Sequence, residues 1–296
     1  MKWWIVSLCT LASLCAQNNP SGRVTGRIVG RGVGPMPGEV LVVMSGGGVR
    51  LNSIATDAQG IFTMDLPPGQ VLLVARAEGY ASEERQLQVR PAPGNAEAVF
   101  TLSPAGQLSG RVFDGNGAGV PGAKVWVNYA GEARSWRLAD EAGGEAADAF
   151  GYFTIPMVAQ GRPFVLEAES EEWLPSSSGT LVLRGREMAG VVLLLSRRGT
   201  MVRGRVIDGA GNPVTAAAIR LRAIPAPGEF SAEQRASIAF ARSMNKTTFS
   251  AADGSYAFTG IPAGRVVVTA EAAGRRAAAE ADTALGREVE IVLVPK

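Results

Sequence analysis

Apolar and polar residues alternate along the chain in short segments separated by Gly, Pro, Asp and Asn. In the C-terminal segment Val289, Ile291 and Leu293 alternate with two glutamates and Val292. Successive side chains of a strand point to opposite faces, so the first three residues should face a core. Short alternating segments between turn residues predict antiparallel sheets that pack face to face as β-sandwiches.

One pattern occurs three times. Segments of the form apolar-x-Gly-Arg-apolar begin at Val24, Leu108 and Val202, and their glycines are 84 and 94 residues apart. Each copy continues with a glycine turn and an aromatic-rich segment, such as Asp253-Gly254-Ser255-Tyr256, and ends in an apolar strand. Repeats of roughly 80 to 100 residues can each hold a core, so the pattern predicts domains in tandem rather than a solenoid.

The copies give the expected domain boundaries. We expect a signal peptide at 1–16, a linker at 17–21, and β-sandwiches at 22–104, 105–197 and 198–296. The third sandwich should carry a short helical insertion near 231–243, because Ser231 and Gln234 form a capping-box pattern and the helix could run to about Ser243.

These motifs resemble a known family. The sequence Gly-Arg-Val-x-Asp-x-x-Gly-x-x-Val-Pro-Gly-Ala from Gly110 to Ala123 is similar to the start of the carboxypeptidase regulatory-like domain, a transthyretin-like sandwich. The resemblance covers residues 22–296 in three copies and implies an all-β fold of three tandem Greek-key, transthyretin-like β-sandwich domains. It also implies non-catalytic modules, like the accessory domains of peptidases, transporters and adhesins. The family's Gly-Tyr pair is present at Gly79-Tyr80 but replaced by Glu172-Trp173 and Gly274-Arg275.

The N-terminus indicates export. Lys2 precedes an apolar stretch from Trp3 to Leu14, and a polar run follows Ala16. This pattern predicts a secretory signal cleaved after Ala16 and a periplasmic or extracellular protein. The alternative, a retained membrane anchor, needs about 20 apolar residues and is disfavoured by the length of the stretch. Both cysteines lie within the predicted signal, so the mature chain should contain no thiol and no disulfide.

Composition excludes several kinds of chemistry. The chain has no histidine, which rules out a Ser-His-Asp triad, a Cys-His pair and a histidine zinc site. The net charge is +2 and no polybasic stretch is present, so we expect neither a nucleic-acid partner nor an anionic lipid surface. No cofactor is expected.

Aromatic residues of the second sandwich are the candidate ligand-binding residues. Trp126 and Asn128 alternate with core-facing Val125 and Val127, so they should lie on an outward face. An exposed tryptophan can stack on a sugar ring or anchor a protein partner. The candidate set is Trp126, Asn128, Trp136 and Tyr152. The alternative is that the long insertion of this sandwich covers Trp126.

Two further patterns suggest chemistry weakly. Carboxylates at Asp140, Glu141, Glu145 and Asp148 form a calcium candidate, although their spacing differs from that of an EF-hand and simple solvation is the alternative. Ser243-Met244-Asn245-Lys246 matches the Ser-x-x-Lys pattern of penicillin-binding enzymes, whose other motifs are absent.

The sequence therefore predicts an exported, non-enzymatic protein that binds a polysaccharide or an envelope protein. The alternative is a structural spacer or protein-interaction scaffold without a sugar site. A Ser/Lys or carboxylate hydrolase is a remote alternative.

Overall fold

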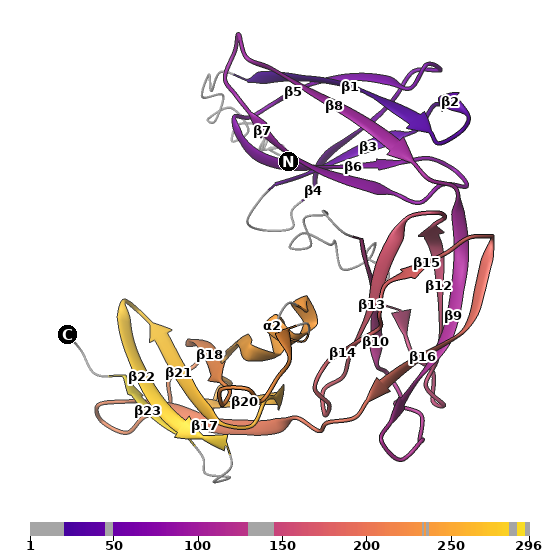
Figure 1. Cartoon of the computed structure of the whole chain (residues 1–296). Coiled ribbons are helices and arrows are strands. Elements are labelled where there is room, and N and C mark those ends of the chain that lie inside the picture. The colour runs from indigo at the N-terminus through magenta and orange to yellow at the C-terminus, as the bar shows by residue number, and fades with distance from the viewer. Residues whose placement is uncertain are drawn as a thin grey trace, which may run out of the picture. The chain divides into compact units, whose positions relative to one another are not determined.

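The regular secondary structure of the described residues is nearly all β-strand. The computed structural model describes residues 21–44, 50–129, 145–232, 234, 237–283 and 289–293 (Figure 1). The predicted all-β fold is confirmed, since the secondary structure of this part of the chain is strand apart from single turns and the seven-residue helix α2 (Ile238–Met244). The chain divides into two compact units: unit 1 comprises residues 1–78 and 82–102, and unit 2 comprises residues 79–81 and 103–296.

Unit 1 contains two sheets. In the first, β1 (Gly22–Gly30) lies between antiparallel β5 (Ile61–Leu66) and parallel β8 (Asn95–Leu102), and β2 (Gly34–Pro35) pairs with its end. The second has the order β4-β3-β6-β7, with bounds Arg50–Ala55, Glu39–Met44, Gly69–Arg76 and Glu83–Val89. Phe62 and Phe100, both buried, bring their ring centroids to 6.2 Å from each other.

Unit 2 contains two pairs of sheets. The sheets of the first pair have the orders β12-β9-β16 and β11-β10-β13-β14, with β15 also paired to β13. The bounds of β9 to β16 are Ala105–Asp114, Lys124–Tyr129, Glu145–Ala146, Tyr152–Ala159, Pro163–Glu169, Ser176–Ser177, Leu181–Val182 and Glu187–Leu195. Their shared core includes Leu108, Phe153, Phe164, Leu166 and Leu193.

The second pair in unit 2 has the orders β20-β17-β23 and β19-β18-β21-β22. The bounds of β17 to β23 are Thr200–Asp208, Ala218–Ile224, Asn245–Phe249, Ser255–Ile261, Arg265–Ala272, Arg275–Asp282 and Val289–Leu293. Val206, Ile219, Phe258, Val266 and Ile291 contribute to its core.

The same strand arrangement recurs in all three sheet pairs and explains the repeated glycine. Each opening strand (β1, β9 or β17) lies between an antiparallel strand and a parallel final strand. A Cβ on Gly110 would lie 2.1 Å from the Val191 carbonyl oxygen and 2.7 Å from the Phe153 ring. Gly26 is equally crowded, by the Ala98 carbonyl and the Phe62 ring. Only glycine therefore allows the final strand and the aromatic residue to pack this closely.

Aspartates fix the tight turns of the repeat. The Oδ1 atoms of Asp57, Asp114, Asp148 and Asp208 each accept two backbone N–H bonds, from the residues two and four positions later. A carboxylate that satisfies two turn amides stabilises the turn locally. The backbone N–H of Asn212 and its side-chain amide also lower the pKa of Asp208.

The helix differs from its predicted extent. Ser231 and Gln234 exchange the two hydrogen bonds of a capping box, 2.9 and 3.1 Å long. However, Ser237 is extended (φ −67°, ψ 136°), and its hydroxyl accepts a bond from Phe240 N, so α2 begins only at Ile238. The expected continuous helix is thus interrupted, because Ser237 acts as an N-cap in its own right.

Helix α2 attaches the second sheet pair of unit 2 to the first. Its residue Phe240 packs against Phe230 with centroids 4.5 Å apart, and both rings join Leu174 in a buried cluster. Glu167 on β13, only 3% exposed, accepts bonds from Ser237 Oγ at 2.9 Å and Ala239 N at 3.1 Å. A buried carboxylate requires such donors, so α2 supplies what β13 needs. No helix in the described residues is long and apolar enough to span a bilayer.

Candidate functional site

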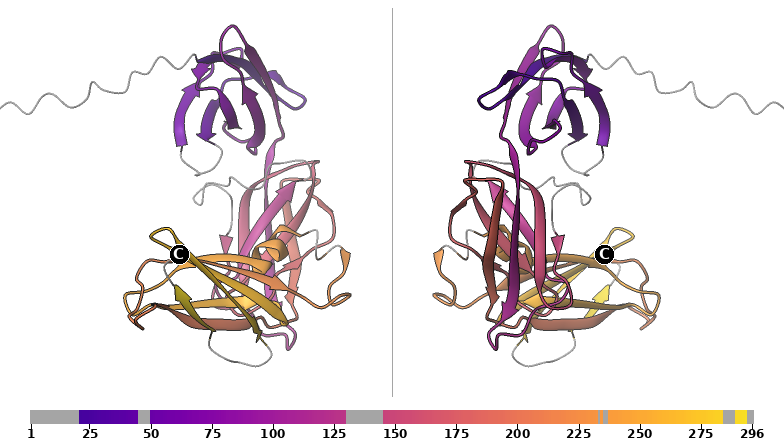
Figure 2. Two further views of the ribbon diagram at one scale, coloured as in Figure 1. Left: turned by 90° about the vertical axis from the view of Figure 1, so that its left-hand side faces the viewer. Right: turned by 90° about the vertical axis from the view of Figure 1, so that its right-hand side faces the viewer.

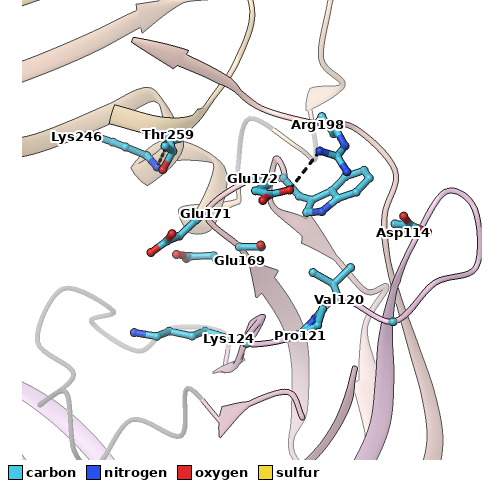
Figure 3. Close-up of a pocket in the computed structure, with 14 residues that line it drawn as sticks. Asp114, Val120, Pro121, Lys124, Glu169, Glu171, Glu172, Arg198, Lys246 and Thr259 are labelled. Atoms are coloured by element: carbon cyan, nitrogen blue, oxygen red, sulfur yellow. Dashed lines mark hydrogen bonds and ion pairs between the residues drawn. The ribbon is translucent and has the colours of Figure 1, made fainter. Parts of the chain in front are cut away.

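A pocket of about 770 Å³ in unit 2 is the candidate site (Figure 3). Its charged lining comes from both sheet pairs of this unit. The acidic residues are Asp114, Glu169, Glu171 and Glu172, and the basic residues are Lys124, Arg198 and Lys246. Pockets of several hundred Å³ with convergent polar groups are typical binding sites.

Strand β13, its neighbour β10 and the residues that follow β13 position the glutamates of the pocket. Glu169 ends β13, and its cross-strand partner is Lys124 at the start of β10. Ser170, Glu171 and Glu172 follow directly in the chain. Because Glu167 and Glu169 alternate with the core residues Leu166 and Ala168, both glutamates point to the outer side of the sheet, where α2 lies.

Glu169 is the carboxyl group most affected by this setting. Burial raises the pKa of Glu169, and Glu167 nearby acts in the same direction. Arg242, whose Nη1 lies 3.2 Å from Glu169 Oε1, opposes the rise, as does Lys246. Burial outweighs these positive charges because it disfavours the ionised carboxylate.

The pKa of Lys246, which lines the same pocket, is shifted in the opposite direction. Its Nζ donates a short hydrogen bond to the Thr259 carbonyl oxygen. Burial lowers the pKa of Lys246, and the charges of Glu169 and Glu171 counteract this only in part. An acid and an amine displaced in opposite directions within one pocket mark a functional-site candidate.

The other end of the pocket carries an indole. Arg198 lies over the Trp173 ring, with 4.8 Å from Cζ to the centroid, and pairs with Glu172 at 3.2 Å. Both charged side chains are more than two-thirds exposed, so solvent screens their attraction. Trp173 itself is buried and also contributes to the lining.

The predicted aromatic group does not assemble as one strip. Trp126 is half-buried beneath Arg242, whose Cζ lies 5.5 Å from the ring centroid, and Asn128 is only 5% exposed. Trp126 Nε1 and Asn128 Nδ2 are buried without a hydrogen-bond partner in the part of the chain the structure describes. Tyr152 is 55% exposed, but it belongs to β12 in the opposite sheet. Trp136 lies outside the described residues.

The structure therefore corrects the expectation that Trp126 and Asn128 form an exposed surface. Both residues lie on the outward face of the sheet, as predicted, but the sequence did not reveal that α2 from the next repeat packs over this face. The residue that covers Trp126 is Arg242, 116 positions further along the chain.

The calcium candidate receives no geometric support within the described residues. Asp140 and Glu141 lie outside them, and Glu145 is exposed on β11. Asp148 Oδ1 is engaged by the amides of Phe150 and Tyr152. Among the residues that the structure describes, no three His, Cys, Asp or Glu side chains are grouped as a metal would require.

The Ser-x-x-Lys pattern does not form a nucleophile and base pair. Ser243 is 3% exposed, and its hydroxyl donates to the Phe240 carbonyl at 2.7 Å. Lys246 donates to the carbonyl of Thr259. Each group is therefore occupied by the backbone, and the serine is closed to a substrate.

Sequence analysis did not identify most of the pocket. The signal that could have found it is the run Glu167-Ala168-Glu169-Ser170-Glu171-Glu172, which places two carboxylates at the end of β13 and two directly after it. Lys246 stands out in the sequence only through its spacing from Ser243, which does not predict its place in the pocket. Lys124 and Arg198 carry no distinguishing pattern and Asp114 belongs to a repeated turn, so the sequence does not indicate that the three residues meet after folding.

Comparison with known proteins establishes the family. The sequence profile of the carboxypeptidase regulatory-like domain matches residues 23–103 and 201–294, more than half of the chain. The chain therefore belongs to the carboxypeptidase regulatory-like domain family, whose modules are non-catalytic. The profile does not match the central region. No curated protein matches the chain significantly.

Among solved structures, the chain resembles three bacterial proteins at low similarity. The Bacillus anthracis TIE protein is 12% identical with a TM-score of 0.28, covering 94% of this chain and 50% of its own, so the chain spans half of that protein's length. BcpA, the major pilin subunit of Bacillus cereus, is 12% identical with a TM-score of 0.26 over 93% of this chain and 99% of its own. Shaft pilin SpaA from Lactobacillus rhamnosus GG is 12% identical with a TM-score of 0.25 over 60% and 98%. Likenesses of this strength do not assign a function.

Proposed function

We propose that this protein is an exported binding module of the cell envelope, and that the pocket of unit 2 binds a segment of polysaccharide. The observation that carries the proposal is the pocket lining. It offers carboxylates, amines and hydroxyls within about 770 Å³, together with Trp173. A chain of sugar hydroxyls can exchange hydrogen bonds with both kinds of charged group.

The proposal includes three modules and a cleaved leader. The strand arrangement of the central sheet pair equals that of the two regions that match the family, which supports reading 105–197 as a diverged third copy. The apolar stretch before Ala16 supports export. Sequencing the N-terminus of the protein secreted by its host tests the leader, and the expected first residue is Gln17.

A second candidate function is a structural spacer or protein-interaction scaffold. It is favoured by the attachment of α2 to β13, which joins the two sheet pairs of unit 2 through Glu167 and the Phe240 cluster. A scaffold uses this rigidity and leaves the pocket empty, whereas a polysaccharide-binding module uses the pocket that the attachment creates.

Titration with host envelope polysaccharide separates the two candidates. The chain is titrated while tryptophan fluorescence is followed, with calorimetry as a second readout. We expect saturable binding that weakens at least tenfold in Glu171→Gln, since Glu171 lines the pocket and has no hydrogen bond of its own among the described residues. Glu187→Gln is the matched control, an exposed carboxylate of β16 outside the pocket.

Three outcomes of this titration are distinguishable. Trp126→Ala should leave binding unchanged, because Arg242 already covers that ring. Absence of binding in both readouts overturns the polysaccharide proposal and favours the scaffold. Equal affinity of Glu171→Gln and the parent chain would show that binding occurs elsewhere.

A further inference from the structure

An exposed apolar surface lies on the outer side of the β12-β9-β16 sheet of unit 2. The ribbon of this sheet lies opposite that of β10 and β13 (Figures 1 and 2). In one cross-strand row Tyr152 and Val192 flank Arg111, and in the next Phe113 lies beside Leu194. Tyr152, Val192 and Leu194 are 55%, 56% and 43% exposed. We call these five residues the Arg111 face. None of them lines the pocket.

Arg111 is held at the centre of this face by its neighbours. Its Cζ lies 5.1 Å from the Tyr152 ring centroid and 5.8 Å from that of Phe113. Its Nε donates to the Phe150 carbonyl oxygen at 2.9 Å. None of the ion pairs within the described part of the chain involves Arg111, so its charge is positioned by Phe150 and is not neutralised by a carboxylate there.

The corresponding arginine of the third repeat, Arg205, is paired with a carboxylate. Arg205 faces Ser255 and Glu290 across its strands and forms an ion pair with Asp253 at 3.7 Å. Asp253 precedes Ser255 by two positions, just as Phe150 precedes Tyr152. The central repeat has thus a 69% exposed phenylalanine where the third repeat has the neutralising carboxylate.

The first repeat provides a further contrast. Arg27 lies between Ile61 and Val99, and Thr101 occupies the position of Leu194. Apolar residues are therefore present there too, but no aromatic ring flanks the arginine. Among the side chains that the structure describes, this combination of an unneutralised arginine with two rings and two aliphatic side chains occurs in the central repeat alone.

We propose that the Arg111 face docks a protein partner through an Asp or Glu side chain that is flanked by apolar residues. Charge complementarity requires the carboxylate, because the internal hydrogen bond of Arg111 goes to a neutral carbonyl oxygen and leaves the charge of its guanidinium unpaired. Tyr, Phe and Arg are enriched at the centres of protein interfaces. Val192 and Leu194 favour a polypeptide over a sugar chain, since they present apolar area and no hydrogen-bonding group. This surface is additional to the pocket and does not depend on it.

A displayed library of random 12-residue peptides tests the proposal. The immobilised full chain selects peptides, and the affinities of the enriched peptides are measured against variants. We expect enriched peptides to share an acidic residue between apolar residues. Their affinity should fall at least tenfold in Arg111→Ala and in Phe150→Asp, which supplies Arg111 with the internal carboxylate seen beside Arg205.

Matched controls separate this result from general effects of charge or folding. Arg205→Ala removes an equivalent arginine and should change affinity less than twofold. Phe150 and Arg111 are surface residues, so far-UV circular dichroism of their variants should equal that of the parent chain. No enriched peptide, or enriched peptides that bind Arg111→Ala and Phe150→Asp as tightly as the parent chain, would overturn the proposal. So would envelope polysaccharide binding that is lost in these two variants.

Discussion

The two outer faces of the central sheet pair carry similar residues, but helix α2 covers one face and leaves the other exposed. On β10 and β13, Trp126 lies beneath Arg242 of α2, with 5.5 Å between Cζ and the ring centroid. On β9 and β12, Tyr152 lies beside Arg111 at 5.1 Å, but no helix covers it. Both faces therefore pair an arginine with an aromatic ring, and only the first is enclosed.

This comparison shows that an outward strand position becomes buried when another element packs over it. Glu167 is an outward residue of β13, yet α2 encloses it and supplies two hydrogen-bond donors. A buried carboxylate without donors would cost several kcal/mol, so helix and glutamate must occur together. Arg111 needs no such support, because water solvates its free N–H groups.

The largest expected effect comes from removing the apolar contacts by which α2 packs on the first sheet pair of unit 2. Phe240→Ala removes a 2% exposed ring from the cluster with Phe230 and Leu174. We expect the free energy of unfolding of unit 2 to fall by about 3 kcal/mol, the usual cost of truncating a buried phenylalanine. Urea denaturation followed by tryptophan fluorescence measures this loss, since Trp126, Trp136 and Trp173 all belong to unit 2.

Phe249→Ala is the matched control for this measurement. Phe249 lies on β19 in the same sheet pair and is 70% exposed. Its removal should change the free energy of unfolding by less than about 0.5 kcal/mol. Equal losses in the two variants would contradict the role assigned to the Phe240 cluster.

A smaller loss in the free energy of unfolding is expected from removing the hydrogen bonds between α2 and Glu167 of β13. Glu167→Ala leaves Ser237 Oγ and Ala239 N without their acceptor, and we expect a loss of about 2 kcal/mol. Glu167→Gln keeps one acceptor oxygen and should lose about half as much. The same denaturation experiment compares them with Glu187→Ala, an exposed site that should be nearly neutral. A neutral Glu167→Ala would show that α2 does not depend on this carboxylate.

Much of the fold was predictable because its determinants are local. Alternation and Asp-x-x-Gly turns specify strands and turns through nearby contacts. Asp114, for example, accepts the backbone N–H groups of Asn116 and Ala118 within its own turn. The Gly-Arg pattern is visible as a repeat, although Gly110 accommodates groups that are distant in sequence, the Phe153 ring and the Val191 carbonyl. The helix was placed only in part, because Ser231 and Ser237 both have capping ability and sequence alone did not rank them.

The site was largely unpredictable because it depends on contacts between repeats. Trp126 was correctly placed on an outward face, but its cover comes from Arg242 in the next repeat. Glu169 and Lys246 are 77 residues apart in sequence and share a pocket only because α2 packs on β13. Periodicity specifies the direction of a side chain within its sheet and contains no information about what the next module places over it.

The smallest expected effect concerns the arginine that covers Trp126. Arg242→Ala removes the cation over the ring and the partly exposed pair with Glu169, and we expect a loss of about 0.5 to 1 kcal/mol near pH 7. Tryptophan fluorescence should shift to longer wavelength, and acrylamide should quench it more strongly. Arg220→Ala, an exposed arginine of β18, is the control and should change neither signal.

The loss in Arg242→Ala should also depend on pH, with a sign fixed by Glu169. Burial holds the pKa of Glu169 above its ordinary value of 4.5, so the folded chain binds more protons than the unfolded chain between these two values. Stability contributed by this group therefore falls as pH rises through that window. Without Arg242 the pKa of Glu169 rises further and the window widens. The parent and Arg242→Ala should thus approach each other in stability as pH falls below 4.5, where Glu169 is protonated in both states, and separate towards pH 7. Urea denaturation at pH 4 and pH 7 measures the difference, and a gap that is the same at both values would assign the loss to the contact with Trp126 alone.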